Sequence, residues 1–211
     1  LPSLFTIGSA SSTYCAGGSG VNISLTGSEL GVNYQLYHSG TPTGSALPGT
    51  GAAIDFGFVL PAGNYTAVGV NSTTGCTRTM TSSVSVIVNP LPSVYTVTGG
   101  GSYCFGGSGV TIGLSGSNPG ISYQLMLGSA PSGSAVTGTG GPITFGSRTV
   151  AGVYTVVATN IATTCTSNMT GTASVAVNAV PAIHTVSGGG NYCIGSAGVH
   201  VTLSGSTLGV N

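Results

Sequence analysis

Charged side chains are nearly absent from this sequence. Its 211 residues include two Lys or Arg and two Asp or Glu residues, so the formal net charge is zero. Ordinary globular chains are about one quarter charged. Phosphate binding needs clustered Lys and Arg, and this chain has no Lys, which excludes nucleic acid as a partner. The four charged residues are Glu29, Asp55, Arg78 and Arg148.

Long apolar runs are absent as well. No stretch approaches the roughly 18 to 20 residues that cross a bilayer, so no membrane span is expected in these residues. Trp, which often forms platforms for sugars, does not occur. Val, Ile, Thr and Tyr are abundant instead, which separates this chain from disordered sequences and predicts an all-β fold.

The sequence repeats at a step of 89 residues. Tyr14-Cys15 recurs as Tyr103-Cys104 and as Tyr192-Cys193, and Cys76 recurs as Cys165. A repeat of domain size predicts tandem modules that each fold as a unit. We expect repeat 1 over residues 1–90, repeat 2 over 91–179 and the start of repeat 3 over 180–211, as part of a longer array.

Each repeat is expected to be an immunoglobulin-like β-sandwich. About 89 residues suit seven or so short strands, and proline-bearing linkers such as Asn89-Pro90-Leu91-Pro92 separate the repeats. We predict strands near residues 21–26, 33–37, 53–59, 64–70 and 77–88 from period-two alternation and glycine-rich turns. The residues predicted to be buried are Val21, Ile23, Leu25, Tyr34, Leu36, Ile54, Phe56 and Tyr65.

The cysteines predict disulfides and therefore an oxidising, extracellular setting, because they recur without a CxxC pair or a nearby recurrent His. We expect one bond within each repeat, Cys15–Cys76 and Cys104–Cys165. The partner of Cys193 would then lie beyond Asn211. The alternative that remains open is Cys76–Cys104 with Cys165–Cys193, across the linkers.

Catalytic, metal and cofactor sites are not expected. Acid–base or nucleophilic catalysis needs a base or paired carboxylates, whereas Glu29 and Asp55 align with Asn118 and Thr144 in repeat 2. The two arginines are equally unmatched. His38, His184 and His200 do not recur between repeats, and we interpret them as solvent-facing or linker residues.

The stretch Ala62-Gly63-Asn64-Tyr65-Thr66 returns as Ala151-Gly152-Val153-Tyr154-Thr155, followed in each case by a cysteine. Together with the Tyr-Cys pair and the proline linker, it resembles the immunoglobulin-like and PKD-like repeats of giant secreted surface proteins of Bacteroidetes, such as gliding-motility adhesins and type IX secretion cargo. The resemblance implies export and an adhesive or scaffolding role by analogy.

The resulting functional hypothesis is a non-enzymatic, extracellular structural protein that forms a cell-surface stalk, fibre or filament. Self-association is expected because a surface of zero net charge lacks the repulsion that keeps β-rich proteins apart. Contact with a glycan, a host or a substratum surface is a further expectation. Two alternatives stay open: a carbohydrate-binding array, and a passive spacer for a catalytic domain elsewhere.

Overall fold

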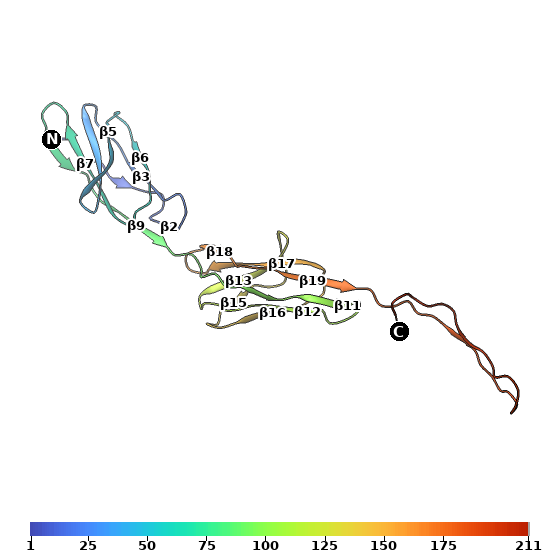
Figure 1. The fold of residues 1–211 in the computed structure, drawn as a ribbon. Coiled ribbons are helices and arrows are strands. Elements are labelled where there is room, and N and C mark those ends of the chain that lie inside the picture. Colours follow the sequence, from blue (N-terminus) through green and yellow to red (C-terminus); the bar gives the residue numbers. More distant parts are fainter. Residues whose placement is uncertain (211) are drawn as a thin grey trace. The chain divides into compact units, whose positions relative to one another are not determined.

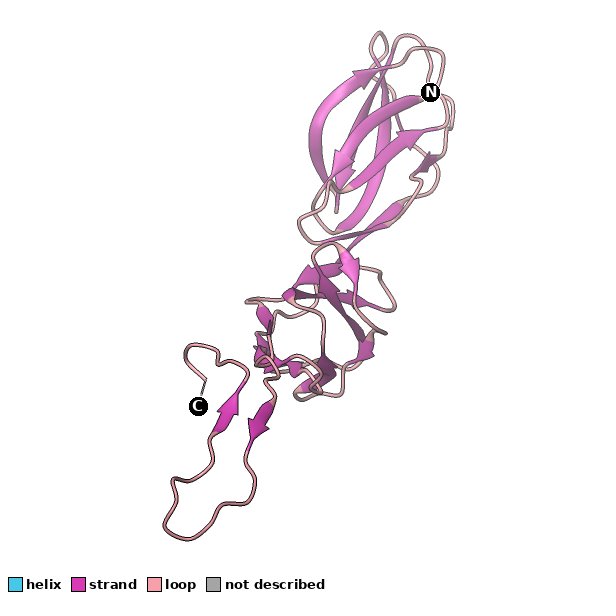
Figure 2. Ribbon diagram, turned by 90° about the vertical axis from the view of Figure 1, so that its right-hand side faces the viewer, coloured by secondary structure: helices cyan, strands magenta, loops and turns pink. Residues whose placement is uncertain are grey.

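The computed structural model describes residues 1–210 (Figure 1), and within them it consists of strands and loops without a helix (Figure 2). The strands of repeat 1 are β1 (Ile7–Gly8), β2 (Thr13–Cys15), β3 (Val21–Leu25), β4 (Val32–His38), β5 (Thr41–Pro48), β6 (Ile54–Val59), β7 (Gly63–Asn71), β8 (Thr77–Thr79) and β9 (Val84–Asn89).

The strands of repeat 2 are β10 (Val97–Gly99), β11 (Gly101–Cys104), β12 (Val110–Leu114), β13 (Ile121–Leu127), β14 (Ala130–Pro131), β15 (Val136–Thr137), β16 (Ile143–Arg148), β17 (Gly152–Asn160), β18 (Thr166–Asn168) and β19 (Ala173–Asn178). A last hairpin pairs β20 (Val186–Gly188) with β21 (Val201–Leu203).

The described chain divides into two compact units. The first holds Leu1–Val94, Asn118–Tyr123 and Val157–Asn168, and the second holds Tyr95–Ser117, Gln124–Val156 and the chain from Met169 onward. Strand pairing follows the sequence repeat: β1 to β9 pair among themselves, and so do β10 to β19. Repeat boundaries at residues 90 and 179 remain our prediction.

Repeat 1 consists of two sheets that share one core. One sheet has the order β1-β3-β6, and the other has the order β2-β9-β7-β4-β5 with β8 also on β7. Side chains from both sheets, including Ile23 and Leu25 of β3 and Tyr34 of β4, form a single buried cluster. Two sheets with one shared core define a β-sandwich. The predicted all-β, immunoglobulin-like fold is thereby confirmed.

Repeat 2 has the same arrangement. The order β10-β12-β16 corresponds to β1-β3-β6, and β11-β19-β17-β13-β14 corresponds to the larger sheet. In both repeats the first strand is divided between the sheets: β2 runs parallel to β9, and β11 runs parallel to β19. This parallel pairing places each Tyr-Cys motif beside the strand that leads into the next linker.

Predicted burial is confirmed at seven of the eight named positions, and the exception is Phe56, which is half-buried against the core. Phe56 lies at a β-bulge in β6, where the register with β3 shifts and Gly57 adopts φ +84°. The stretch over residues 77–88, predicted as a strand long enough to bend or to change partner partway, is interrupted and forms two strands. Ser82 has φ +66° there, and the chain forms β8 and β9 as separate strands on β7.

Buried tyrosines have their hydroxyl groups satisfied inside the sandwich. Tyr34 accepts a hydrogen bond from Glu29 N at 2.9 Å, and Tyr123 accepts one from Asn118 N at 2.9 Å. Tyr65 donates to the Pro61 carbonyl at 2.9 Å, and Tyr154 donates to the Val150 carbonyl at 2.8 Å. All four tyrosines are core residues, as predicted for Tyr34 and Tyr65, and none of the four presents its ring to solvent as a platform for a sugar.

Candidate functional site: a disulfide between repeats

Two of the four charged side chains hold the N-terminal segment of repeat 1. Ser3 donates to the carboxylate of Glu29 from its backbone N–H at 2.7 Å and from its hydroxyl at 2.6 Å. Arg78 Nη1 donates to the carbonyl oxygen of Pro2 at 3.1 Å. The hydrogen bonds from Ser3 lower the pKa of the Glu29 carboxyl. Glu29 and Arg78 therefore have a structural role that the sequence did not indicate.

The other two charges lie in the small sheets. Asp55 accepts hydrogen bonds from Asn22 Nδ2 at 3.0 Å and from Gly57 N at 2.8 Å, which fixes the bulge in β6. Arg148 Nη2 donates to the Ser132 carbonyl at 3.4 Å. These contacts are local, and no group of three or more His, Cys, Asp or Glu side chains in residues 1–210 is arranged to hold a metal ion.

The three histidines have different surroundings. His38 Nε2 lies 2.9 Å from the Ala62 carbonyl oxygen, and its ring stacks on Tyr65 with centroids 4.7 Å apart. This residue is half-buried in β4, so its prediction as a solvent-facing residue is wrong. His184 Nε2 lies 3.4 Å from Thr207 Oγ1. His200 is exposed, as predicted.

A groove of about 400 Å³ opens beside the core of repeat 1. Its lining includes Thr43 and Ser45 of β5 and Asp55 and Phe58 of β6. Phe58 is 65% exposed. In repeat 2, Arg148 takes the sequence position of Val59, another lining residue, and its guanidinium donates to the Ser132 carbonyl. It also occupies the space that a Cβ on Gly133 would enter. Repeat 2 therefore has an arginine where repeat 1 has a valine that lines the groove.

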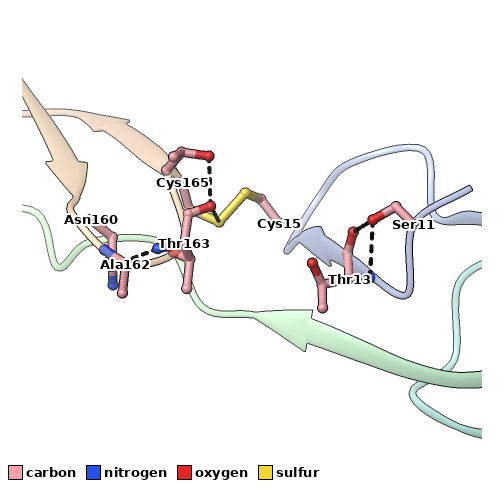
Figure 3. Close-up of a disulfide and its surroundings, with 8 residues drawn as sticks. Ser11, Thr13, Cys15, Asn160, Ala162, Thr163 and Cys165 are labelled. Atoms are coloured by element: carbon pink, nitrogen blue, oxygen red, sulfur yellow. Dashed lines mark hydrogen bonds between the residues drawn. A yellow bond between two sulfur atoms is a disulfide. The ribbon is translucent and has the colours of Figure 1, made fainter.

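A disulfide joins Cys15 of repeat 1 to Cys165 of repeat 2, with their Cα atoms 5.6 Å apart (Figure 3). Cys76, Cys104 and Cys193 are free and exposed. The predicted pairs Cys15–Cys76 and Cys104–Cys165 are therefore wrong. The alternative pairs Cys76–Cys104 and Cys165–Cys193 are not formed either.

Strand register explains why the bond within repeat 1 does not form. Cys15 is opposite Asn89 at the end of β9, whereas β7 starts at Gly63 opposite Val86 and runs the other way. Cys76 follows the far end of β7, where its carbonyl accepts from Asn71 N. The path from Cys15 to Cys76 runs from Asn89 back to Val86 on β9 and then from Gly63 to Asn71 on β7. This is about eleven residues along the strands, or roughly 35 Å. A disulfide needs Cα atoms within about 7 Å.

Local hydrogen bonds shape the segments that lead to the two cysteines of the disulfide (Figure 3). On one side, Ser11 Oγ donates to the Thr13 carbonyl at 2.9 Å, at the start of the strand that ends with Cys15. On the other side, Asn160 Oδ1 accepts from Ala162 N at 2.9 Å and from Thr163 N at 3.1 Å, which shapes the turn before Cys165.

The tyrosine before Cys15 has a positioning role that sequence reasoning missed. Tyr14 donates from its hydroxyl to the Leu60 carbonyl, and Tyr103 donates in the same way to the Thr149 carbonyl. Because the tyrosine ties the short strand to the loop before β7, the adjacent cysteine is held at the end of the sandwich. The recurrence of the Tyr-Cys pair was the available signal for this role.

Solved structures with some similarity to the chain are themselves immunoglobulin-like or fibronectin-like. The fibronectin(III)-like modules of Clostridium thermocellum CbhA are 14% identical, with a TM-score of 0.43 over 82% of this chain and 95% of that chain. Murine CEACAM1b is 10% identical, with a TM-score of 0.42 over 82% of this chain and 100% of that chain.

The human OSCAR ligand-binding domain is 13% identical, with a TM-score of 0.35 over 82% of this chain and 98% of that chain. No family model and no curated protein matches the chain. In residues 1–210 there is no helix with the length and apolar character to span a membrane. The structure thus defines a disulfide-bonded protein of immunoglobulin-like β-sandwiches.

Proposed function

We propose that this chain is a non-enzymatic, extracellular structural and adhesive repeat protein, which forms a cell-surface stalk, fibre or filament. The observation that carries the proposal is the Cys15–Cys165 disulfide, because it bonds one repeat to the next and closes no loop within a single core. Disulfides persist in oxidising compartments, which supports export. The resemblance of the Tyr-Cys and linker motifs to Bacteroidetes surface repeats supports an adhesin of that kind.

Lateral association is the second part of the proposal. Exposed apolar side chains such as Phe58, Ile87 and Val153 lie on a surface with four full charges. Such a surface has little electrostatic repulsion, so contacts would depend on apolar burial and neutral hydrogen bonds. Association of this kind is expected to be nearly insensitive to ionic strength, because screening acts on charges.

Light scattering tests this association on the full chain with Cys76, Cys104 and Cys193 replaced by Ser. This variant keeps the Cys15–Cys165 bond and cannot form disulfides between molecules. We expect the mean mass to rise with protein concentration and to stay the same between low and physiological salt. A protein that stays monomeric at high concentration would overturn the proposed assembly and would favour a passive spacer.

Carbohydrate binding is the second candidate function, and the groove of repeat 1 favours it. The groove combines the exposed ring of Phe58 with hydroxyl groups from Thr43 and Ser45, which is the mixture of apolar face and polar groups that sugars bind. A glycan array probed with the full chain tests it. Binding that Phe58→Ala abolishes, and that Phe105→Ala in repeat 2 leaves unchanged, would support this candidate.

A further inference from the structure

The strand end that carries Cys104 reproduces the strand end that carries Cys15. Cys15 is paired with Asn89, and Cys104 is paired with Asn178, in each case as the last residue of a short parallel strand. The following residue donates to the carbonyl of that asparagine in both repeats, at 2.9 Å from Ala16 and 2.8 Å from Phe105. The two ends therefore present their cysteines on the same backbone scaffold.

The hairpin that carries Cys76 likewise reproduces the hairpin that carries Cys165. Asn71 N donates to the Cys76 carbonyl at 2.9 Å, and Asn160 N donates to the Cys165 carbonyl at 2.8 Å. The side-chain oxygen of Asn71 accepts from Thr73 N at 3.0 Å and Thr74 N at 2.9 Å, as that of Asn160 does from its own turn.

Each hairpin is also tied in the same way to the loop before β4 in repeat 1 or β13 in repeat 2. Ser72 N donates to the Gly31 carbonyl at 2.9 Å, and Ile161 N donates to the Gly120 carbonyl at 3.1 Å. The difference between the hairpins is their exposure. Cys165 is 1% exposed, whereas Cys76 is exposed. The hairpin cysteine of repeat 2, which is bonded to Cys15, is therefore buried, whereas the equivalent cysteine of repeat 1 is exposed.

An apolar groove adjoins the free cysteine of repeat 2. It has a volume of about 340 Å³ and is lined by Phe105, which directly follows Cys104, and by Val177, Asn178, Ala179 and Val180. Phe105 is 72% exposed. An exposed aromatic ring beside a free cysteine supplies apolar surface that a bonded hairpin would cover.

We propose that Cys104 of one molecule forms a disulfide with Cys76 of a second copy of this chain, in the manner of the Cys15–Cys165 bond. The strand end with Cys104 would receive the hairpin with Cys76, and the Phe105 groove would contact that hairpin. This inference deepens the proposed function, on which it rests, by assigning the residues that join one molecule to the next.

The oxidant is a low-molecular-weight disulfide such as glutathione disulfide. The Cys104 thiolate attacks one sulfur of that disulfide, which forms a mixed disulfide and releases one glutathione thiolate. The Cys76 thiolate of the second copy then attacks the Cys104 sulfur, and the second glutathione leaves. Each protein thiol has lost a proton, one protein disulfide has formed, and one glutathione disulfide has been reduced to two thiols.

A linkage of this kind continues from molecule to molecule. The two surfaces that meet are different, a strand end and a hairpin, so the contact is heterologous. Heterologous contacts that do not close into a ring produce open chains. Cys76 and Cys104 are both free in residues 1–210, so linkage through both of them gives a linear, covalently linked filament as the expected product.

The test is oxidation of the purified full chain in a glutathione redox buffer, followed by non-reducing electrophoresis and peptide mapping. We expect a ladder of covalent oligomers that grows with protein concentration and collapses with dithiothreitol. Mixing ¹⁴N-labelled and ¹⁵N-labelled protein should yield Cys76–Cys104 peptides with one light and one heavy half. Peptides that are only uniformly labelled would show a bond within one chain and would overturn the proposal.

Complementary variants supply the control. Cys76→Ser and Cys104→Ser alone should not form the ladder, whereas an equimolar mixture should form mixed dimers well in excess of like dimers. Cys193→Ser should keep the ladder of the unmodified chain. Mixed and like dimers in equal amounts would indicate unselective thiol pairing and would overturn the proposal. The light-scattering variant lacks all three free cysteines, so it tests non-covalent association alone. Failure of that association and failure of the Cys76–Cys104 linkage can therefore be told apart.

Discussion

The hydroxyl oxygen of Tyr34 accepts a hydrogen bond of 2.9 Å from the backbone N–H of Glu29, five residues earlier in the chain. The ring is fully buried and lies edge-on to Phe5, with centroids 6.3 Å apart. Burial raises the pKa of the Tyr34 phenol, so the group stays protonated at neutral pH. The same bond joins Tyr123 to Asn118, which makes it a fixed element of the repeat.

Replacing Tyr34 with Phe should lower the unfolding free energy of repeat 1 by about 1 to 3 kcal/mol, because the N–H of Glu29 would lose its partner. Denaturant unfolding of the full chain measures the change. Tyr37→Phe is the matched control on the same strand, and its half-buried ring should leave stability nearly unchanged. Equal effects from the two variants would contradict the role of the Tyr34 hydroxyl.

Ile23→Ala should cost roughly 2 to 5 kcal/mol, because Ile23 is fully buried in β3. Ser24→Ala, on the exposed face of the same strand, should cost little. Chemical denaturation compares the two variants. Asn22→Ala should cost more than Ser24→Ala, since the side chain of Asn22 donates to Asp55. Similar losses for Ile23→Ala and Ser24→Ala would mean that the register of β3 is misassigned.

Gly75→Ala should destabilise repeat 1 by about 1 kcal/mol, because a positive φ strains residues that carry a Cβ. Gly75 has φ +69°, and a Cβ there would have no atom within 4 Å, so the backbone alone sets the cost. Gly8→Ala is the control, since Gly8 has the same open space without a positive φ. Thermal unfolding that showed the two alanines to be equivalent would disprove this explanation.

Ser3→Ala should raise the pKa of Glu29 toward its ordinary value of 4.5, because the hydroxyl of Ser3 donates to the carboxylate. A lowered folded-state pKa stabilises the protein above the ordinary value, and the contribution disappears as pH falls through the folded value. An NMR titration of the Glu29 carboxyl measures the shift. Ser24→Ala should leave it unchanged, and an unmoved midpoint in Ser3→Ala would refute the assignment.

Reduction of Cys15–Cys165 should lower the resistance of the chain to unfolding, because the intact bond closes a loop of 150 residues in the unfolded state. The chain-entropy model gives a loop of this length on the order of 5 kcal/mol. Unfolding of the full chain with and without dithiothreitol measures the loss, and the Cys15→Ser/Cys165→Ser variant should unfold as the reduced protein does. Cys76→Ser is the control, since Cys76 is free, and a loss of the same size from that variant would contradict the Cys15–Cys165 assignment.

Alternation along single strands was sufficient to predict the core. Val21, Ile23 and Leu25 alternate with polar residues. In a two-layer fold such a strand can bury only the face that carries the apolar side chains. The strand over residues 41–48 was missed because its sequence, rich in Pro, Gly and Ser, lacks alternation. Its position at the edge of the larger sheet, next to β4, explains why such residues are tolerated.

The cysteine pairing was not predictable from spacing, because it depends on which end of the sandwich each residue occupies. Cys15 and Cys76 differ by 61 residues, a separation that suits a bond across one core, but strand direction places them at opposite ends. The observed pair, Cys15 and Cys165, is separated by 150 residues, which is the 61-residue spacing plus one repeat of 89 residues. Only the parallel pairing of β2 with β9 reveals that relation, and no local signal indicates a parallel pair.

The Cys15–Cys165 bond also changes how the chain bears tension. A pulling force that enters before Cys15 passes through the two sulfur atoms directly to Cys165, and the 150-residue segment between them carries no load. While the bond is intact, even complete unfolding of that segment would not lengthen the molecule. About 500 Å of contour length therefore becomes available only after the bond is reduced. For a protein on a surface exposed to flow, extensibility would then be set by redox conditions as well as by the strength of the sheets.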